Sequence, residues 1–330
     1  MEQKSLSKQY QKKTDKEHIL DNPDTYIGSV ENVDSNIWLF NNNKIISKHI
    51  NYIPGLYKLF DEGIVNCRDH VIRMLQQKTS GNAYQVNKIE ISVDNDGTIH
   101  MLNDGNGIDV AKHPEYDLWI PEMIFGHLRT STNYNKEEKK IVGGKNGFGF
   151  KLVLIWSTYG KIETVDHVRK LKYVQEFSNN LDNIEAPKIT KCSSKPYTKV
   201  SFKPDYLRFG LDNLNDDMRQ LFKKRVFDVS AVTPKNVKVK FNEELVPVKS
   251  FEQYVDLYIG TKSENTRVHE IPNERWEYSI ALSPSHEFQQ VSFVNGIHTN
   301  KGGKHVDYIL NQITKKMVAF IEKKKKITVN

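Results

Sequence analysis

Leu56-Tyr-Lys-Leu-Phe-Asp-Glu-Gly-Ile-Val-Asn-Cys-Arg-Asp69 is the stretch that decides the fold prediction. Apolar residues recur at helical spacing from Leu56 through Ile64 to Leu75 and form one continuous stripe. The preceding pair Pro54-Gly55 suits a first helical turn, where proline is tolerated. The pattern predicts a long helix with one buried face.

A polar stripe follows another face of the same predicted helix. Glu62, Asn66, Asp69 and Arg73 recur at i, i+4, i+7 and i+11. A carboxylate can accept a proton from water and a carboxamide oxygen can ligate Mg²⁺, so this stripe is a candidate for phosphoryl transfer. Such a stripe is also typical of a solvated helix face, and the helix alone leaves both interpretations open.

The composition describes a chain of 330 residues, long enough for two domains, with 38% apolar and 10% aromatic residues. This supply of core-forming side chains argues against disorder. The net charge of +7 is consistent with a polyanionic partner. With only Cys67 and Cys192, a polar N-terminal segment and no long apolar run, we expect a soluble intracellular protein without disulfides or membrane spans.

Residues 88–102 alternate between apolar and polar on both sides of Asn95-Asp-Gly97, which predicts a β-hairpin. Its second strand runs directly into Asn103-Asp-Gly-Asn-Gly107. A glycine-rich turn at a strand end is a common place for a ligand.

A second glycine-rich segment, Gly143-Gly-Lys-Asn-Gly-Phe-Gly-Phe-Lys151, precedes the apolar run from Leu152 to Trp156. Glycines allow backbone N–H groups to approach a polyphosphate, and a following helix N-terminus favours negative charge. The spacing is not that of a Walker loop, and a glycine-rich loop alone is weak evidence for phosphate binding.

The remaining periodic segments predict strands and helices in two groups. We place a domain boundary after Thr233, giving an N-terminal arm over 1–20, a first domain over 21–233 and a second domain over 234–330. The first group holds strands within 161–177 and 198–203 and a helix over 214–229; the second holds strands at 237–241, 278–282 and 290–294 and a helix from 306 to 321. The last helix ends in Lys323–Lys326, either a solvated helix end or a patch that contacts phosphates.

In their order and spacing, these motifs resemble the N-terminal ATPase region of the eukaryotic-type type IIA DNA topoisomerases. The resemblance covers nearly the whole chain, from Tyr10-Gln-Lys-Lys13 through Pro23-Asp-Thr-Tyr-Ile-Gly-Ser-Val-Glu31 to Lys301-Gly-Gly-Lys-His-Val-Asp-Tyr308. It implies a mixed α/β (α+β) protein, with a GHKL (Bergerat-type) α/β sandwich followed by an incomplete transducer domain of ribosomal-protein-S5-like type.

The resemblance also implies roles for individual residues. Glu62 matches the general base of ATP hydrolysis, Asn66 the Mg²⁺ ligand and Asn103 the residue that reads the adenine amino group. The remaining ATP-binding positions are Tyr26, Asp69, His70, Ser131, Thr132, Asn133, Gly144, Lys145, Asn146, Gly147, Phe148, Gly149 and Lys151. Tyr26 matches a tyrosine that the family links to the dimeric ATP-bound state, and Lys323, Lys324, Lys325 and Lys326 fall at a lysine loop implicated in sensing DNA.

The implied cofactors and partners are ATP, Mg²⁺, double-stranded DNA and a second copy of the chain, which would dimerise on nucleotide binding. We expect the chain to be part of a longer enzyme, because the family's DNA-cleaving domains and a Gln-Thr-Lys loop that reaches the γ-phosphate have no counterpart in it. The expected location is the nucleus for a cellular enzyme, and the host cytoplasm, viral factory or virion for one from a large DNA virus.

Two alternatives remain open: another GHKL ATPase, such as a chaperone or mismatch-repair protein, and a DNA-binding module with a degenerate nucleotide site. The chain departs from the family at Gly63, where relatives carry a bulky aliphatic residue, and at His70, Asp104 and Lys145. Glycine inside a helix costs roughly 0.8–1 kcal/mol relative to alanine, so we expect a locally looser helix beside Glu62.

Overall fold

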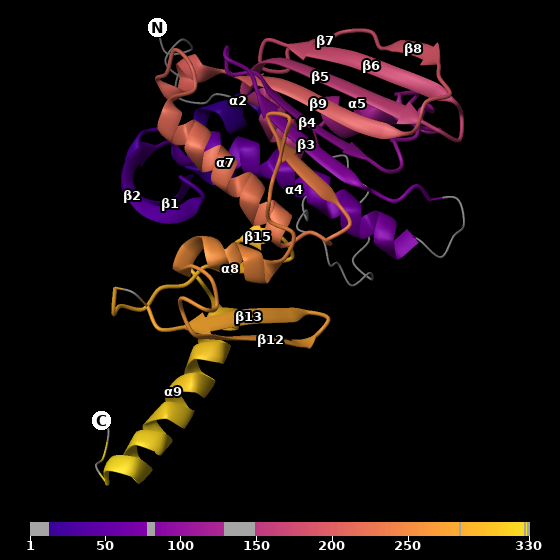
Figure 1. Ribbon diagram of the computed structural model, residues 1–330. Helices are drawn as coiled ribbons and strands as arrows, with labels where there is room; N and C mark the ends of the chain where they lie inside the picture. The colour runs from indigo at the N-terminus through magenta and orange to yellow at the C-terminus, as the bar shows by residue number, and fades with distance from the viewer. Residues whose placement is uncertain (1–12, 78–82, 129–148, 284, 327, 329–330) are drawn as a thin grey trace, which may run out of the picture. The chain divides into compact units, whose positions relative to one another are not determined.

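The computed structural model describes residues 13–77, 83–128, 149–283, 285–326 and 328 (Figure 1). It divides into two compact units, Met1–Gly260 and Thr261–Asn330. Each unit is described by itself below.

The core of the first unit is a mixed sheet, to which the described residues contribute nine strands in the order β11-β10-β3-β4-β9-β5-β6-β7, with β8 also pairing with β6. Among these strands only β10 and β3 pair in parallel. The bounds are β3 Lys88–Val93, β4 Ile99–Asp104, β5 Ser157–Asp166, β6 Leu171–Ser178, β7 Asn183–Ile184, β8 Lys188–Lys191, β9 Tyr197–Pro204, β10 Lys238–Phe241 and β11 Glu244–Leu245. The predicted hairpin is confirmed, because β3 and β4 pair in antiparallel orientation. Burial alternates along both strands, so only one register places all their apolar side chains on the buried face.

Helices pack on the apolar face of this sheet (Figure 1). The predicted long helix is α4, Pro54–Gln76, and the other helices of this layer are α5 Ile120–Gly126, α6 Gly149–Ile155 and α7 Asp216–Ala231. Phe60 of α4 stacks on Phe222 of α7 with ring centroids 4.1 Å apart, and Phe150 of α6 meets Phe202 of β9 edge to face. A short 3₁₀ helix, Tyr206–Phe209, joins β9 to the segment before α7.

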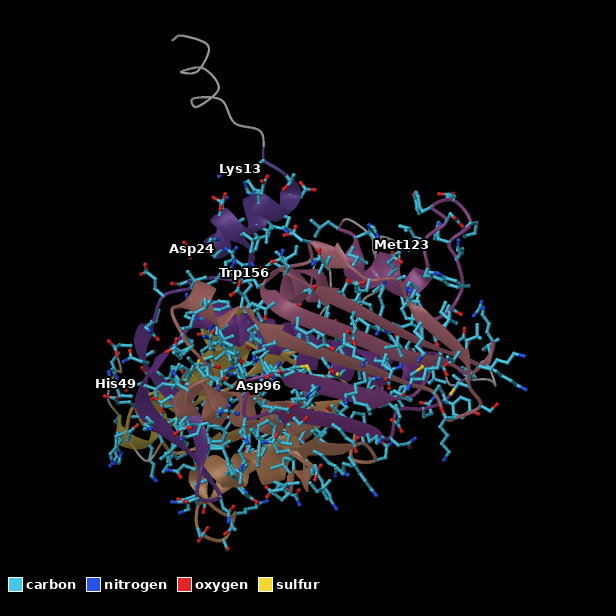
Figure 2. The ribbon with its side chains drawn as sticks, turned by 90° about the horizontal axis from the view of Figure 1, so that it is seen from above. Lys13, Asp24, His49, Asp96, Met123 and Trp156 are labelled. Carbon is cyan, nitrogen blue, oxygen red and sulfur yellow. The ribbon has the colours of Figure 1, made fainter. Side chains whose placement is uncertain are left out.

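The N-terminal segment is partly helical, with α2 at Asp15–Asp21 and α3 at Pro23–Tyr26. Thr14 and Glu17 form a capping box at the start of α2, a signature that the sequence contains. Lys16 pairs with Asp182 in the turn between β6 and β7, and α2 packs on α6. In Figure 2 the labelled residues Lys13 and Asp24, which flank α2, lie on the side of the first unit where Trp156 is labelled. The predicted arm over 1–20 is therefore in part a helix docked on the first unit.

A hairpin that we did not predict, β1 Val33–Asn41 and β2 Lys44–Tyr52, precedes α4. Its turn residues Asn42 and Asn43 both have positive φ, which asparagine tolerates. Phe40 stacks on Phe227 of α7 at 4.1 Å, and Lys48 pairs with Asp217. The hairpin thereby covers one side of α7.

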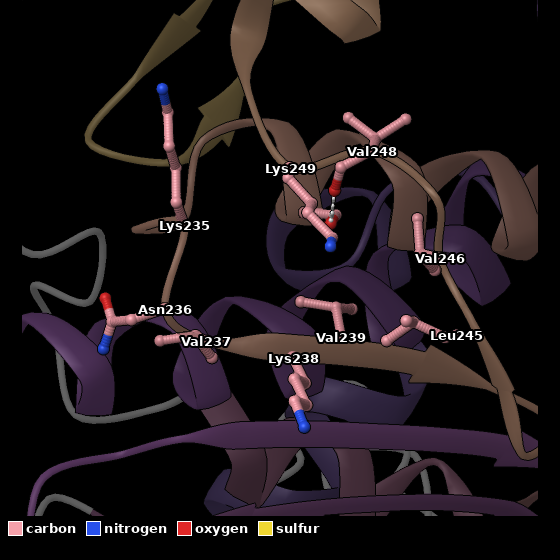
Figure 3. Close-up of a pocket in the computed structure, with 10 residues that line it drawn as sticks. Lys235, Asn236, Val237, Lys238, Val239, Leu245, Val246, Val248 and Lys249 are labelled. Atoms are coloured by element: carbon pink, nitrogen blue, oxygen red, sulfur yellow. Dashed lines mark hydrogen bonds between the residues drawn. The ribbon is translucent and has the colours of Figure 1, made fainter.

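The first unit extends beyond the predicted domain boundary at 233/234. Strand β10 adds to β3 of the main sheet, and helix α8, Phe251–Ile259, packs on α7. Ser230 donates to the carbonyl of Val248 at 2.6 Å, and the segment between them encloses a cavity of about 260 Å³ (Figure 3). The strand predicted at 237–241 therefore belongs to the first sheet, because its backbone groups pair with β3.

The second unit contains two short hairpins and a long helix. The bounds are β12 Arg267–Asn273, β13 Trp276–Ala281, β14 Phe293–Val294, β15 Ile297–His298 and α9 Lys304–Lys325. Trp276 and Tyr308 bring β13 and α9 together, with ring centroids 5.9 Å apart. The predicted C-terminal helix is confirmed, and each of its apolar positions remains at least partly exposed in the described part of the chain.

Gly63 in the middle of α4 is packed rather than loose. A Cβ atom at this position would lie 2.4 Å from Sδ of Met101 on β4, so the methionine fills the space that a larger residue at 63 would take. The departure from the family is therefore compensated across the helix–sheet interface.

This packing predicts that the effect of Gly63→Ala on stability changes sign with the residue at position 101. Gly63→Ala is expected to destabilise the protein by about 1 kcal/mol, because the clash with Met101 outweighs the gain in helix propensity. In a Met101→Val background the same change is expected to stabilise by up to about 1 kcal/mol. Urea unfolding of the four proteins tests this, and an equal effect of Gly63→Ala in both backgrounds would contradict it.

Candidate functional site

Glu62 lies on α4 with its carboxylate held from two sides. Lys58 Nζ is 2.5 Å from Glu62 Oε1, one helical turn away. Gly149, the first residue of α6, approaches the other oxygen so closely that a Cβ atom there would lie 2.5 Å from Oε2. The Glu62 side chain is 23% exposed, so the carboxylate remains accessible to water.

Helix α4, which carries Asn66, packs on strand β4, which carries Asn103. Met101 of β4 packs on Gly63 of α4, and the turn after β4 meets the helix again where Gly105 approaches His70. Helix and strand therefore run side by side in the same direction, and Asn103, on the same face of β4 as Met101, falls level with the middle of this stretch of α4. The structure thus places Glu62 and Asn66 on the helix that packs against the strand of Asn103.

The turn after β4 is tied tightly to β5. Gly107 passes so close to the carbonyl of Val165 that a Cβ atom would lie 2.0 Å from its oxygen. Ile108 N donates to Thr164 Oγ1 at 2.9 Å, and Val110 N donates to Asp166 Oδ2 at 2.9 Å. Glycine is therefore required at 107 by close approach of two backbones.

Asp104 has a structural role. Its Oδ1 accepts hydrogen bonds from the backbone N–H groups of Asn87 and Lys88, at 2.7 and 2.9 Å, which fixes the start of β3. An asparagine oxygen can accept the same two bonds. This departure from the family therefore leaves the geometry of the Asn103 turn intact.

The sheet register adds two residues that we did not predict. Thr198 on β9 lies directly opposite Asn103, and its hydroxyl is 3.0 Å from that of Thr164 on β5. Residues directly opposite in an antiparallel pair project from the same face. Thr198 therefore places its hydroxyl beside Asn103, with Thr164 one strand further across the sheet, and no spacing in the sequence links these three positions.

Lys151 and Asp69 are buried, with 3% and 1% of their surface exposed. Burial lowers the pKa of Lys151 to about 8. A nearby anion would raise this pKa again, because it favours the charged ammonium. Both side chains lie on elements that flank Glu62, α6 and α4 respectively.

His70 is held neutral. Burial lowers its pKa to about 4, the charge of Arg73 acts in the same direction, and a backbone hydrogen bond at Asn106 opposes them. The ring contacts the turn after β4 at Gly105. A neutral imidazole replaces the family's asparagine without adding a charge next to Asn103.

This depressed pKa predicts acid sensitivity. Because the folded pKa lies below the unfolded value of 6.5, the contribution of neutral His70 is complete above pH 6.5 and is lost as the pH falls toward 4. The change corresponds to roughly 3 kcal/mol. Urea unfolding of wild type and His70→Asn between pH 7 and 4 tests it: the wild type should lose more stability, and parallel curves would contradict the prediction.

Other predicted residues lie on other elements or outside the described part. Ser131, Thr132, Asn133, Gly144, Lys145, Asn146, Gly147 and Phe148 are outside the described residues. Tyr26 ends α3, where its hydroxyl is 3.0 Å from His18 Nδ1. Lys323, Lys324 and Lys325 form the exposed last turn of α9, and Lys326 is its C-cap.

A buried ion pair supports the helix that carries Glu62. Arg225 of α7 is fully buried and donates from Nε to Asp61 Oδ1 at 2.6 Å. Burial alone would lower the pKa of Arg225, but the charge of Asp61 outweighs it and the pKa is raised. The pair thus joins α4 to α7 one residue before Glu62.

No group of three or more His, Cys, Asp or Glu side chains within the described ranges is arranged to hold a metal ion. Searched in the same ranges, the helices include none with the length and hydropathy of a bilayer-spanning segment.

Comparison with known proteins identifies relatives of this fold and site. The family model described as DNA gyrase B matches residues 238–330. DNA topoisomerase 2 of Acanthamoeba polyphaga mimivirus is 45% identical over 98% of this chain, and that of Arabidopsis thaliana is 44% identical over 98%. The chain spans 26% and 22% of their lengths, about a quarter.

Solved structures extend the similarity to the whole architecture. The ATPase region of Saccharomyces cerevisiae topoisomerase II matches with a TM-score of 0.88 and 40% identity, covering 96% of this chain and 82% of that one. The ATPase and transducer domains of Balamuthia mandrillaris topoisomerase II match with a TM-score of 0.87 and 39% identity, covering 96% and 79%. These relatives favour a topoisomerase ATPase over a chaperone or mismatch-repair protein. The chain belongs to the type II DNA topoisomerase family and corresponds to its GHKL ATPase and transducer region.

Proposed function

We propose that this chain is the ATP-operated gate of a type II DNA topoisomerase. In this proposal it binds ATP with Mg²⁺, dimerises around a DNA segment and hydrolyses ATP to reset. The observation that carries the proposal is the packing of α4, which carries Glu62 and Asn66, on β4, which carries Asn103, with Gly149 at the start of α6 close to Glu62.

The site residues divide the work between binding and chemistry. In this proposal Asn103 and the hydroxyl of Thr198, which lies opposite it on β9, read the adenine edge. Lys151 neutralises phosphate charge from a buried position. Glu62 orients and deprotonates the attacking water, as hydrolysis without a covalent intermediate requires.

Asn66 fits a Mg²⁺ ligand. In the described parts of the chain no hydrogen bond occupies its carboxamide, which is partly exposed and one turn from Glu62. Mg²⁺ is usually held by one or two protein oxygens together with substrate phosphates and water, so a single carboxamide suffices without an acidic cluster. Mg²⁺ bound there neutralises charge on the phosphates.

Two further features support the gate. Tyr26 lies at the end of the N-terminal helices, and in this proposal it reaches the nucleotide site of a second copy. Lys323, Lys324, Lys325 and Lys326 are exposed at the end of α9, where they contact DNA phosphates in this proposal. Such contacts depend strongly on salt and read no sequence.

Nucleotide binding is tested by thermal shift. A ligand that binds only the folded state stabilises it by about 2.7 kcal/mol at a hundred times its Kd, so Mg·ATP is expected to raise the melting temperature by several degrees. ATP with EDTA should give a smaller shift, and MgCl₂ alone almost none. No shift at millimolar Mg·ATP would contradict the proposal and favour a DNA-binding module with a degenerate site.

A further inference from the structure

Lys58 has one ion-pair partner among the described residues, and that partner is Glu62. The distance from Nζ to Oε1 is 2.5 Å, and the Lys58 side chain is 41% exposed. Burial of its stem would lower the pKa of Lys58, but the nearby Glu62 carboxylate outweighs it and the pKa is raised. The ammonium is therefore charged whenever Glu62 is ionised.

Helix stability does not account for this pair. A lysine placed N-terminal to a glutamate at i, i+4 is the weaker order of the two, and such exposed pairs contribute only about 0.3–0.5 kcal/mol. The pair also occupies a carboxylate oxygen at the centre of the candidate site rather than on an outer face.

The second carboxylate oxygen is confined on the opposite side. A Cβ atom built on Gly149 would lie 2.5 Å from Oε2, so the start of α6 borders this oxygen and limits rotation of the carboxylate toward it. A glutamate side chain has three rotatable bonds, and contact with Gly149 alone excludes one direction without selecting an orientation. Lys58 supplies the attraction that selects it.

We propose that Lys58 is a positioning residue for Glu62, holding the carboxylate against Gly149 in the orientation that activates the attacking water. The proposal rests on the proposed role of Glu62 as general base. Without Lys58 the carboxylate samples other rotamers, and displacement of a catalytic group by about 1 Å can cost up to a hundredfold in rate. Nucleotide contacts are made by other residues, so affinity is expected to remain.

The test compares Lys58→Met and Lys58→Arg with a matched control, Lys48→Met, which removes another exposed lysine of the first unit from its pair with Asp217. Single-turnover hydrolysis of Mg·ATP, the Kd for a non-hydrolysable ATP analogue and the melting temperature are measured for each. We expect Lys58→Met to hydrolyse about ten- to a hundredfold more slowly. Its Kd and melting temperature should match the wild type, Lys58→Arg should recover most of the rate, and Lys48→Met should be unchanged.

Three results would overturn the proposal. Lys58→Met could hydrolyse ATP as fast as the wild type, which would show that Lys58 does not affect the reaction, or faster, which would show that Lys58 slows it. Rate, affinity and melting temperature could fall together, which would indicate a structural role. Lys58→Arg could fail to recover the rate. Failure of the proposed function is distinguishable, because the wild type would then show no thermal shift with Mg·ATP and no hydrolysis, and a wrong assignment of the base would leave Glu62→Gln as active as the wild type.

Discussion

Glu62→Gln is expected to reduce ATP hydrolysis by about 10²–10⁴-fold while nucleotide binding is retained. Glutamine has nearly the same shape and keeps the contact with Gly149, but a carboxamide cannot accept a proton from water. The loss therefore falls on the chemical step. Single-turnover hydrolysis and the thermal shift with Mg·ATP, measured on the same preparations, separate the two effects.

Glu90→Gln is the matched control for this change. Glu90 lies on β3 of the same unit and pairs with Lys88 at 3.1 Å and Lys240 at 3.3 Å, away from the candidate site. Glu90→Gln should leave hydrolysis unchanged, because it removes one negative charge, as Glu62→Gln does, but Glu90 contacts no residue of the candidate site. Hydrolysis by Glu62→Gln within a few-fold of the wild type would show that another group activates the water.

Arg225→Met is expected to lower the free energy of unfolding by about 3–5 kcal/mol, because it leaves the Asp61 carboxylate without its buried cation. Arg225 is 0% exposed, so water cannot replace the lost interaction. The damage lies next to Glu62 on α4, and we expect slower hydrolysis as a secondary effect. Urea unfolding with a linear extrapolation measures the change.

Arg208→Met provides the comparison. Arg208 also pairs through Nε, with Asp205 at 3.0 Å, but its side chain is 42% exposed, so its loss should cost less than about 1 kcal/mol. Adding Asp61→Leu to Arg225→Met removes the unpaired charge and should restore part of the stability. An equal loss in the free energy of unfolding for Arg225→Met and Arg208→Met would show that burial does not make the pair more important for stability.

Regular periodicity made the main elements predictable. The helix from Pro54 to Gln76 and the hairpin of β3 and β4 follow from local patterns, because each buries one face and its side-chain period reveals which. The hairpin of β1 and β2 was missed even though Asn41-Asn42-Asn43 marks its turn. Its apolar residue Phe40 packs on Phe227 of α7, a contact between distant parts of the chain that the local sequence pattern does not reveal.

The domain boundary shows the same limit. A change of pattern near Thr233-Pro234 suggested a division there, whereas the compact first unit continues to Gly260. Strand β10 joins β3 across about 150 positions of sequence, and a parallel pairing of this kind leaves no local signature.

The sequence by itself determined the chemistry available to this protein: a carboxylate and a carboxamide one helical turn apart, an asparagine at a strand end and a glycine-rich segment. Order and spacing along the chain are enough for that, because motifs are local. Only the tertiary structure decided which distant groups meet: Gly149 against Glu62, Thr198 opposite Asn103, and Met101 in the space left by Gly63. These contacts depend on strand register and on the packing of helices with each other and with the sheet, which are set by burial of the whole core.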